Sequence, residues 1–393
     1  MNEVFIASAV RTPIGTMQGS FQDTAATELG AVVMKEACQR AGAAGERIDH
    51  VYMGQVLQGG IGMNGARQAS LRAGIPVRVP ATSVNLVCGS GLQAVMGGAQ
   101  CIRSGDADVI VAGGMENMSQ SPYMLKKARQ GYRYGHGELV DSALHDGLTC
   151  AIISQPMGWT AERLAERYGL TREEQDAFAL RSQQRAQAAM EDGRFHEEIV
   201  AVSVADRQGG ARLIAADEHP RPGLTMEALA RLRPAFSAQG TVTAGNSSGI
   251  NDGAAAVVLC GRKAADTHGI APVAAIRGYA AVGLEPEWMG LGPVPALKEA
   301  IRRAGLRLQD IGLFEVNEAF AAQTLAVMNE LGLDPERVNV NGGAIALGHP
   351  IGASGARVLV TLIHEMRRRH IRYGAASLCV GGGHGVAVVV ERS

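Results

Sequence analysis

The sequence predicts an α/β fold, and three observations support this. Apolar runs rich in β-branched residues alternate with amphipathic helical segments in the first and last thirds of the chain. Hydrophobic residues make up 46% of the chain, enough for a large core, and 51 glycines can supply many tight strand-to-helix turns. Because 393 residues exceed one ordinary domain, we expect about two or three domains.

The first third of the chain is predicted to alternate between strands and helices. The expected strands are VFIASAV, VYMGQVL, SVNLV and DVIVAGG, and two expected helices lie near 26–41 and 65–73. A third helix should follow Cys88 and end at Ser104-Gly105. Apolar residues recur there at helical spacing, namely Leu92, Val95, Met96, Ala99 and Ile102.

The character of the sequence changes between about 118 and 246, a stretch with a high share of charged residues. A helix is expected after Thr171, because Glu174 completes a capping box, and it should end at Asp192-Gly193.

From INDGAAAVVL onward the alternation resumes, which predicts a second α/β portion. The expected strands are IRGYAAVG, LFEVN, VNVNGG, AASLCVGG and VAVVVER, and the expected helices begin at Pro295 and lie near 318–331 and 353–369. Each α/β portion ends near a glycine pair and supplies one candidate cysteine. This similarity indicates an internal duplication.

The composition argues against several classes of function. A net charge of −1 without a long basic run disfavours nucleic acid as the main ligand. Six cysteines without a CxxC pair indicate reduced thiols. No apolar stretch is long enough to cross a membrane, and MNEVFIASAVRTPIG offers too short an apolar run for a signal peptide. We therefore expect a soluble, cytoplasmic protein without a membrane partner.

Cys88, in LVCGSGLQ, is the first candidate catalytic residue. It lies between a predicted strand and a predicted helix, where the free N–H groups of the helix N-terminus should lower the pKa of the thiol. Gly89 and Gly91 leave room for a substrate. The alternative is a buried structural cysteine, which is our interpretation of Cys38, Cys101, Cys150 and Cys260.

A second thiol and an imidazole occupy similar glycine-rich turns, Cys379 in LCVGGGHG and His349 in GHPIGASG. Asn317 follows the apolar run LFEV, where a helix N-cap and a site-facing amide are both reasonable. Taken singly, His349 fits a turn and Asn317 a cap. Together with Cys88 they indicate acyl transfer: one thiolate attacks an acyl carbon, the imidazole helps to form it, and the second thiol moves a proton.

Three competing motifs predict other functions. Gly60, Gly62 and Gly65 match the dinucleotide pattern, but no acidic residue follows between 51 and 105 to hold a ribose. GNSSG matches the serine-hydrolase pattern with Ser247 as nucleophile, although GINDG is a poor start for the helix that should follow. HEMRRRH lacks zinc-binding spacing and is expected to be the charged end of a helix, so no metal site is predicted.

The chain resembles the thiolase family, and within it the bacterial acetyl-CoA acetyltransferases. The resemblance rests on motifs that span nearly the whole chain in family order: LVCGSGLQ, AGGMENMS, TAGNSSGINDGAAA, PEWMGLGPVPA, VNEAFAAQ, NGGAIALGHPIGASG and LCVGGGHG. It implies two similar α/β halves in a duplicated five-layered αβαβα fold with an inserted loop domain, and usually a homotetramer. The implied divisions are 1–118 continued by 249–270, then 119–248, then 271–393.

The resemblance also implies the role of each catalytic residue. Cys88 would take the acyl group and His349 would activate it. Cys379 would be the acid or base for the α-carbon of the second acetyl-CoA. Asn317 would hold a water that, with His349, stabilises the enolate oxygen. The N–H groups of Cys88 and Gly381 would form the other oxyanion hole.

The same resemblance implies how substrates bind. No permanently bound cofactor is expected; acetyl-CoA, acetoacetyl-CoA and CoA would be the ligands. Positions that match the coenzyme A site are Arg221, Ser248, Leu148, Phe236, Ala244 and Phe320. Met157 and Met289 match the methionines that border the acyl pocket, where flexible thioethers suit a small acyl group.

Four departures from the family pattern concern substrate preference. Gln155-Pro156 replaces a typical Tyr-His before Met157, and Trp288 adds bulk beside Met289. His384 stands where Gln or Met is usual, and Leu86 replaces a common basic residue. The expected activity is the condensation of two acetyl-CoA to acetoacetyl-CoA and CoA, with the reverse thiolysis. The alternatives are a degradative 3-ketoacyl-CoA thiolase for longer chains, a serine hydrolase and a non-catalytic acyl-CoA-binding protein.

Overall fold

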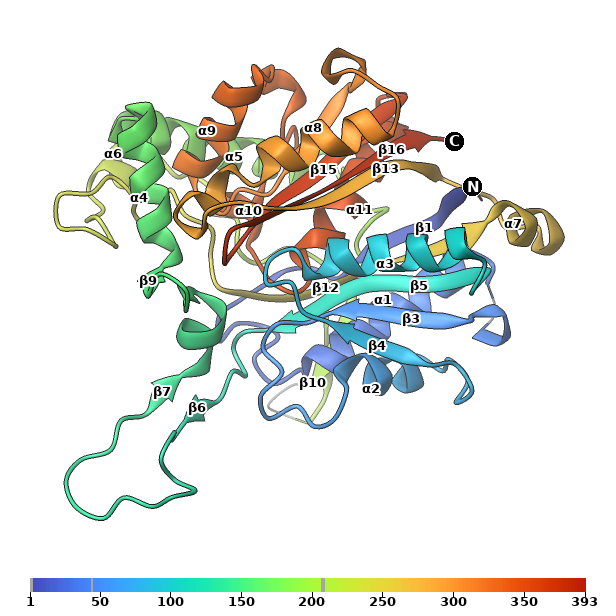
Figure 1. Cartoon of the computed structure of the whole chain (residues 1–393), viewed down its shortest axis with the longest axis horizontal. Helices are drawn as coiled ribbons and strands as arrows, with labels where there is room; N and C mark the ends of the chain where they lie inside the picture. The colour runs from blue at the N-terminus through green and yellow to red at the C-terminus, as the bar shows by residue number, and fades with distance from the viewer. Residues whose placement is uncertain (1–2, 44, 206–208) are drawn as a thin grey trace.

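The computed structural model describes residues 3–43, 45–205 and 209–393, and it stacks helices and strands in five layers (Figure 1). Strands from both ends of the chain join in one path of neighbours, β14-β15-β16-β13-β1-β12-β5-β3-β4, with the short β2 beside β12. The path has two parts that meet where Phe5 and Ile6 of β1 pair with Ala275 and Ala274 of β13.

The first part contains the strands from the N-terminal portion and one strand that returns after residue 250. Their bounds are β1 (Val4–Arg11), β2 (Gly15–Thr16), β3 (His50–Gly54), β4 (Ala81–Val84), β5 (Val109–Asn117) and β12 (Asn251–Gly261). β3 pairs in parallel with β4 and β5, whereas β12 pairs antiparallel with both β5 and β1.

The second part repeats this arrangement with strands from the C-terminal portion. Their bounds are β13 (Ala274–Gly283), β14 (Leu313–Val316), β15 (Tyr373–Val380) and β16 (His384–Arg392). β14 pairs in parallel with β15, and β16 pairs antiparallel with both β15 and β13. The repeated order of strands agrees with the duplication that the sequence indicates.

Helices cover both outer faces and fill the space between the two parts. One outer layer contains α1 (Ala26–Arg40) and α2 (Gly65–Arg72), and the other contains α8 (Pro293–Arg303) and α9 (Ala321–Leu331). The middle layer contains α3 (Ser90–Ser104) and α11 (Ser354–Arg368). Two shorter helices complete the fold. α7 (Arg262–His268) follows β12, and α10 (Ala344–Leu347) precedes the loop that carries His349.

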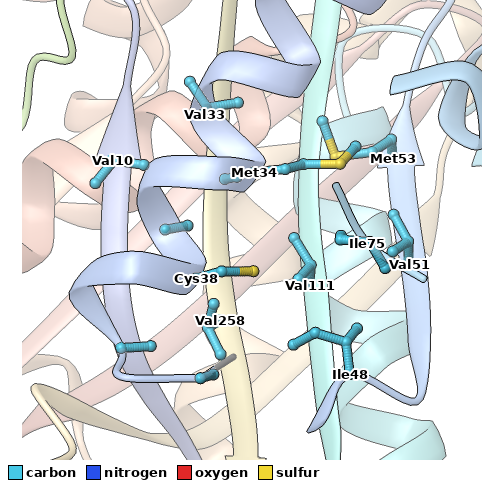
Figure 2. Close-up of a cluster of buried hydrophobic side chains, with 14 of the residues drawn as sticks. Val10, Val33, Met34, Cys38, Ile48, Val51, Met53, Ile75, Val111 and Val258 are labelled. Carbon is cyan, nitrogen blue, oxygen red and sulfur yellow. The ribbon is translucent and has the colours of Figure 1, made fainter. Parts of the chain in front are cut away.

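Side chains of the buried strands alternate between layers, as a strand's twofold period requires. On β12, Val258 belongs to the core beneath α1, whereas Val257 and Leu259 belong to the core around α3 and α11. Figure 2 shows the first of these cores, where Met34 and Cys38 of α1 lie against the strands. Cys38 is thus a packing residue, as predicted.

A long insertion separates β5 from β12. Its elements are β6 (Tyr123–Met124), β7 (Val140–Asp141), η2 (Ala143–Gly147), β8 (Thr149–Cys150), β9 (Gln155–Pro156), α4 (Met157–Tyr168), α5 (Arg172–Glu191), β10 (Val202–Ala205), β11 (Ala211–Ile214) and α6 (Met226–Ala230). The segment around β6 and β7 extends away from the layers in Figure 1. The capping box of Thr171 and Glu174 is present at α5, as predicted. The domain boundaries stated above stay a prediction.

One strand prediction was wrong for an identifiable reason, and two predicted helices begin a few residues away from their expected starts. VNVNGG forms no regular strand: the backbone of Asn339 is left-handed (φ 47°), and its side chain bonds the N–H and the carbonyl of Val316 in place of a neighbouring strand. The helix expected from 318 begins at Ala321, with Phe320 at its N-cap, and the helix expected from Pro295 begins at Pro293. Across the described residues, we find no helix with the length and apolarity needed to span a bilayer.

Candidate active site

The Cys88 turn is a strained connection between β4 and α3. Val87 adopts a left-handed conformation (φ 42°), which is costly for a β-branched residue. Ser90 stabilises the turn, because its hydroxyl accepts the N–H of Leu86 (2.9 Å) and donates to the carbonyl of Val87 (2.6 Å). The turn therefore holds Cys88 two residues before Ser90, the first residue of α3.

The Cys88 thiol is protonated at neutral pH. Burial raises its pKa to about 11, although hydrogen bonds from the N–H groups of Gly381 and Cys88 itself lower it. The expectation that the helix N-terminus lowers this pKa is therefore wrong for the resting state, since desolvation outweighs the donated hydrogen bonds. The two donors are the N–H groups named above as the expected oxyanion hole.

Cys379 lies at the end of β15 and is buried. Burial raises the pKa of its thiol, and the nearby Cys88 thiol raises it further. The strand end and the turn thus place the two sulfur atoms within electrostatic range of each other, with both thiols neutral at rest.

His349 is buried, and its hydrogen bonds define its tautomer. The Ser354 hydroxyl donates to the carbonyl of Pro350 (2.9 Å), so it must accept a proton from Nδ1 of His349, which lies 2.6 Å away. Nε2 is then the unprotonated nitrogen. Burial lowers the pKa of His349 to about 3, and the positive charge of Arg357 contributes. The imidazole is a neutral base at physiological pH.

Asn317 is a site-facing amide and not a helix cap. Its Nδ2 lies 3.4 Å from Nε2 of His349, and its backbone N–H donates to Ser377 (2.9 Å). Its buried Oδ1 has no hydrogen-bond partner among the described residues, which leaves it as an acceptor facing the same region. The structure thereby decides between the two interpretations that the sequence left open.

Glycines allow the Cys88 and His349 turns to approach each other. A Cβ on Gly91 of α3 would lie 2.7 Å from the backbone nitrogen of Ala356, and one on Gly355 of α11 would overlap the backbone of Leu92. The first turns of the two middle helices therefore touch backbone to backbone, and only glycine permits this contact.

Glu116 is a buried residue of the site region that the sequence analysis missed. Its carboxylate accepts the N–H groups of Val56 (3.0 Å), Leu57 (3.2 Å) and Gly352 (2.9 Å). Burial raises its pKa to about 7, and its charge contributes to the raised pKa of Cys88. An acidic residue at the end of the apolar run VIVAGGM was the signal that could have revealed it.

The two predicted pocket methionines lie beside the thiols. Met157 and Met289 share one apolar cluster with Cys379, Phe320 and Cys150. A Cβ built on Gly381 would lie 3.3 Å from Sδ of Met157, so Met157 borders the residue whose N–H binds the Cys88 thiol. Apolar side chains thus surround the thiol of Cys379, and one of them, Met157, also borders the residue that binds the Cys88 thiol.

A cavity of about 740 Å³ leads to this region. Eight of the predicted site residues line it: Leu148, Met157, Arg221, Phe236, Ala244, Ser248, Phe320 and His349. Met289, Asn317, Gly381 and the two cysteines are not among its lining residues. Ile351 connects the two regions, because it lines the cavity and belongs to the apolar cluster against which Cys88 packs. Met118, Glu218 and His219 also line it, and sequence reasoning missed them.

Two of the three competing motifs lack the structure that their chemistry requires. Ser247 lines the cavity, but its hydroxyl donates to the carbonyl of Thr243 (2.6 Å), and the chain continues into β12 and not into a helix. His364 of HEMRRRH bonds the carbonyl of Ala9 (2.9 Å). No cluster of three or more potential metal ligands occurs in the part of the chain that the structure describes.

Among the departures, Trp288 lies against α4. Its ring centre lies 4.7 Å from the guanidinium carbon of Arg167 and 5.7 Å from that of Arg163. Pro156 lines the cavity and occupies the N-cap position of α4. Gln155 lies opposite Cys150 in the antiparallel pair of β8 and β9, and the side chain of His384 is exposed. The indole of Trp288 is not among the residues that line the cavity.

Comparison with known proteins identifies the family. The thiolase N-terminal domain matches residues 4–263, and the thiolase C-terminal domain matches residues 270–392. Acetyl-CoA acetyltransferases of Pseudomonas aeruginosa and Escherichia coli are 56% and 55% identical to the chain, with complete coverage of both sequences. The crystal structure of the Bacillus anthracis acetyl-CoA acetyltransferase superposes with a TM-score of 0.98 at 46% identity and covers 100% of this chain and 99% of that one. Both domain matches and the matching architecture show that the chain belongs to the thiolase family.

Proposed function

We propose that the chain is an acetyl-CoA C-acetyltransferase that condenses two acetyl-CoA to acetoacetyl-CoA and CoA, and catalyses the reverse thiolysis. The observation that carries the proposal is the joining of two neutral thiols with a neutral imidazole beside a substrate-sized cavity. The names of relatives that match the whole chain, acetyl-CoA acetyltransferases, support the same reaction.

In the first half-reaction, Cys88 attacks the thioester carbon of acetyl-CoA. Because Cys88 and His349 are both neutral at rest, Nε2 of His349 takes the thiol proton as the S–C bond forms. The N–H groups of Cys88 and Gly381 then bind the developing oxyanion. The departing CoA thiolate takes the proton of Cys379, and acetyl-Cys88 remains.

In the second half-reaction, the thiolate of Cys379 removes a proton from the α-carbon of a second acetyl-CoA. The raised pKa of Cys379 suits this step, since a weakly acidic thiol gives a strongly basic thiolate. Protonated His349 and a water held by Asn317 stabilise the enolate oxygen. The enolate attacks acetyl-Cys88, the Cys88 thiolate leaves and recovers its proton from His349, and acetoacetyl-CoA is released.

Trapping the intermediate tests the proposal. Incubation with acetyl-CoA followed by an acid quench should leave an acetyl mass on the peptide that bears Cys88 and on no other cysteine. Cys88→Ala should remove that mass, and Ser247→Ala should keep it. An acetyl group on Ser247, or none on any peptide, would contradict the assignment. Loss of turnover after alkylation by iodoacetamide would separate an enzyme from a non-catalytic acyl-CoA-binding protein.

Chain length distinguishes the proposed activity from that of a degradative 3-ketoacyl-CoA thiolase. We expect the best thiolysis with acetoacetyl-CoA, measurable activity on five or six carbons, and a steep fall beyond. Without the typical Tyr-His pair, Gln155-Pro156 should raise KM through the loss of a polar contact of about 0.5 to 1.5 kcal/mol. A higher kcat/KM for a ten-carbon substrate than for acetoacetyl-CoA would favour the degradative enzyme. A homotetramer in the cytoplasm, without a permanent cofactor, completes the proposal.

A further inference from the structure

One face of α4 carries a ladder of stacked rings and guanidinium groups. Trp159, Arg163 and Arg167 follow one another at four-residue spacing, so they lie on the same side of the helix. Trp288, from the 3₁₀ segment Pro286–Leu291 (η3), lies against this face. The guanidinium carbon of Arg163 is 5.7 Å from both indole centres, and that of Arg167 is 4.7 Å from Trp288. We call Trp159, Arg163, Arg167 and Trp288 the α4 ladder.

An ion pair reinforces the ladder. Nε of Arg163 donates to the carboxylate of Glu287 (3.0 Å), the residue directly before Trp288. Two consecutive residues of η3 are therefore held by arginines of α4, one through charge and one through its ring. Arg163, Glu287 and Trp288 are each partly exposed, so substitutions there can be accommodated without disturbing a core.

A close contact holds η3 from its other side. A Cβ on Gly290 would lie 2.5 Å from Cδ1 of Leu164 and 2.9 Å from Cγ of Gln323 on α9. Met289 lies between Trp288, which the ladder holds, and Gly290, which α4 and α9 hold. Its position relative to α4 is therefore fixed on both sides.

The other pocket methionine is attached to the same helix. Met157 is the first residue of α4, and it borders Gly381, which binds the Cys88 thiol. The ladder thus joins the helix that begins with Met157 to the segment that carries Met289. We propose that Trp288 and Arg167 are positioning residues that set the acyl-chain preference by holding Met157 and Met289 at a fixed separation. This inference rests on the proposed function, because it concerns the acyl group on Cys88.

Kinetics of ladder variants test the inference. For Trp288→Leu and Arg167→Ala, we expect the ratio of kcat/KM for six-carbon over four-carbon 3-ketoacyl-CoA to rise about threefold to tenfold, which is part of what one methylene group discriminates. Trp288→Phe should keep the wild-type ratio, because a ring remains beneath Arg167. The double variant should exceed neither single variant by much, since both remove the same contact.

A matched control separates positioning from general stability. Arg262 lies 4.2 Å from the ring centre of Phe5, so Arg262→Ala removes another cation–π contact while leaving α4 and η3 intact. That variant should keep the wild-type ratio. An unchanged ratio in Trp288→Leu and Arg167→Ala would overturn the inference, whatever their melting temperatures. Failure of wild-type protein to form acetyl-Cys88 would instead overturn the proposed function.

Discussion

The two α/β halves share one topology but supply different chemistry. In each half a parallel strand pair, β3 with β5 or β14 with β15, is followed by an antiparallel strand that pairs with the first strand of that half. In each half a middle-layer helix precedes the last strand of the parallel pair. The turn before α3 carries Cys88, the proposed nucleophile, whereas the turn before α11 carries His349, the proposed base. Duplication thus gives two equivalent turns, and the different residues in them have different proposed roles.

The halves also support each other through reciprocal contacts. At the end of β5, Glu116 of the first half accepts the N–H of Gly352 in the turn of the second half. Near the end of β15, Gly381 of the second half donates its N–H to Cys88 in the turn of the first half. One contact is a buried carboxylate and the other a backbone donor. The first contact therefore has a structural role, while the second can serve the reaction.

The largest effect is expected where the halves differ most in chemistry, at Cys379. Cys379→Ser should keep slow acetylation of Cys88 but lower condensation about 10²-fold to 10⁴-fold, because serine is a far weaker acid and base at neutral pH. The measurement is the condensation rate beside the acetyl mass on Cys88. Cys150→Ser, in the same apolar cluster, is the matched control and should condense at nearly the wild-type rate. Equal rates in the two variants would contradict the two-thiol mechanism.

The structural contact of Glu116 should contribute to the stability of the fold. Glu116→Ala leaves three backbone N–H groups without their acceptor, which should lower the free energy of unfolding by about 3 kcal/mol. Urea denaturation measures this loss. As a control, Glu36→Ala breaks an exposed ion pair with Arg40 and should change the free energy of unfolding by less than about 1 kcal/mol.

The pH dependence of Glu116→Gln sharpens the same point. Burial raises the folded pKa of Glu116 from its ordinary 4.5 to about 7, so the folded state binds more protons between these values. Its contribution to stability is present below pH 4.5 and is lost as the pH rises through 7. The stability of the wild type relative to Glu116→Gln should therefore fall between pH 5 and 7.5. A constant difference would show that the carboxylate is ionised throughout.

A smaller difference in stability is expected when a methyl group is added at Gly352, in the structural contact, or at Gly381, in the contact that can serve the reaction. A Cβ on Gly352 would lie 2.7 Å from Oε2 of Glu116 and 2.8 Å from the carbonyl of Met115, so Gly352→Ala should cost about 1 to 3 kcal/mol. A Cβ on Gly381 would meet only side-chain atoms of Met157 and Val87, at 3.3 Å. Gly381→Ala should therefore cost less stability. The reverse order in thermal unfolding would refute this assignment of roles.

The smallest effect is expected at Ser354, which fixes the tautomer of His349 in the second turn. Ser354→Ala removes the acceptor of Nδ1 and should slow acetylation of Cys88 about fivefold, the equivalent of one neutral hydrogen bond. Because the pKa of His349 is about 3, acetylation should show no loss from protonation of this residue between pH 5.5 and 8. A titration near pH 6.5 would show that the imidazole is more solvated than the structure indicates.

The sequence predicted the elements whose signal is local. Strand and helix order, the α5 capping box and the two cysteine turns follow from periodicity and glycine placement, and the structure agrees with them. It could not reveal the raised pKa of Cys88, because that depends on how deeply distant segments bury the thiol. The failed strand VNVNGG has the same origin, since Asn339 satisfies Val316 across the fold. For Trp288, the sequence likewise showed a bulky side chain but could not show which residues of α4 it contacts.

The position of β12 has a consequence for how the chain reaches its fold. β12 is buried along its whole length between β1 and β5, yet its register pairs Asp252 with Asn117, about 135 positions earlier. During synthesis, β1 and β5 are complete long before the strand that covers both of their edges has left the ribosome. Until then they expose unpaired backbone and apolar faces, a state prone to aggregation. A fragment that ends at residue 118 lacks β12 and would remain in that state, so the first half can complete its sheet only after the chain beyond the insertion has been made.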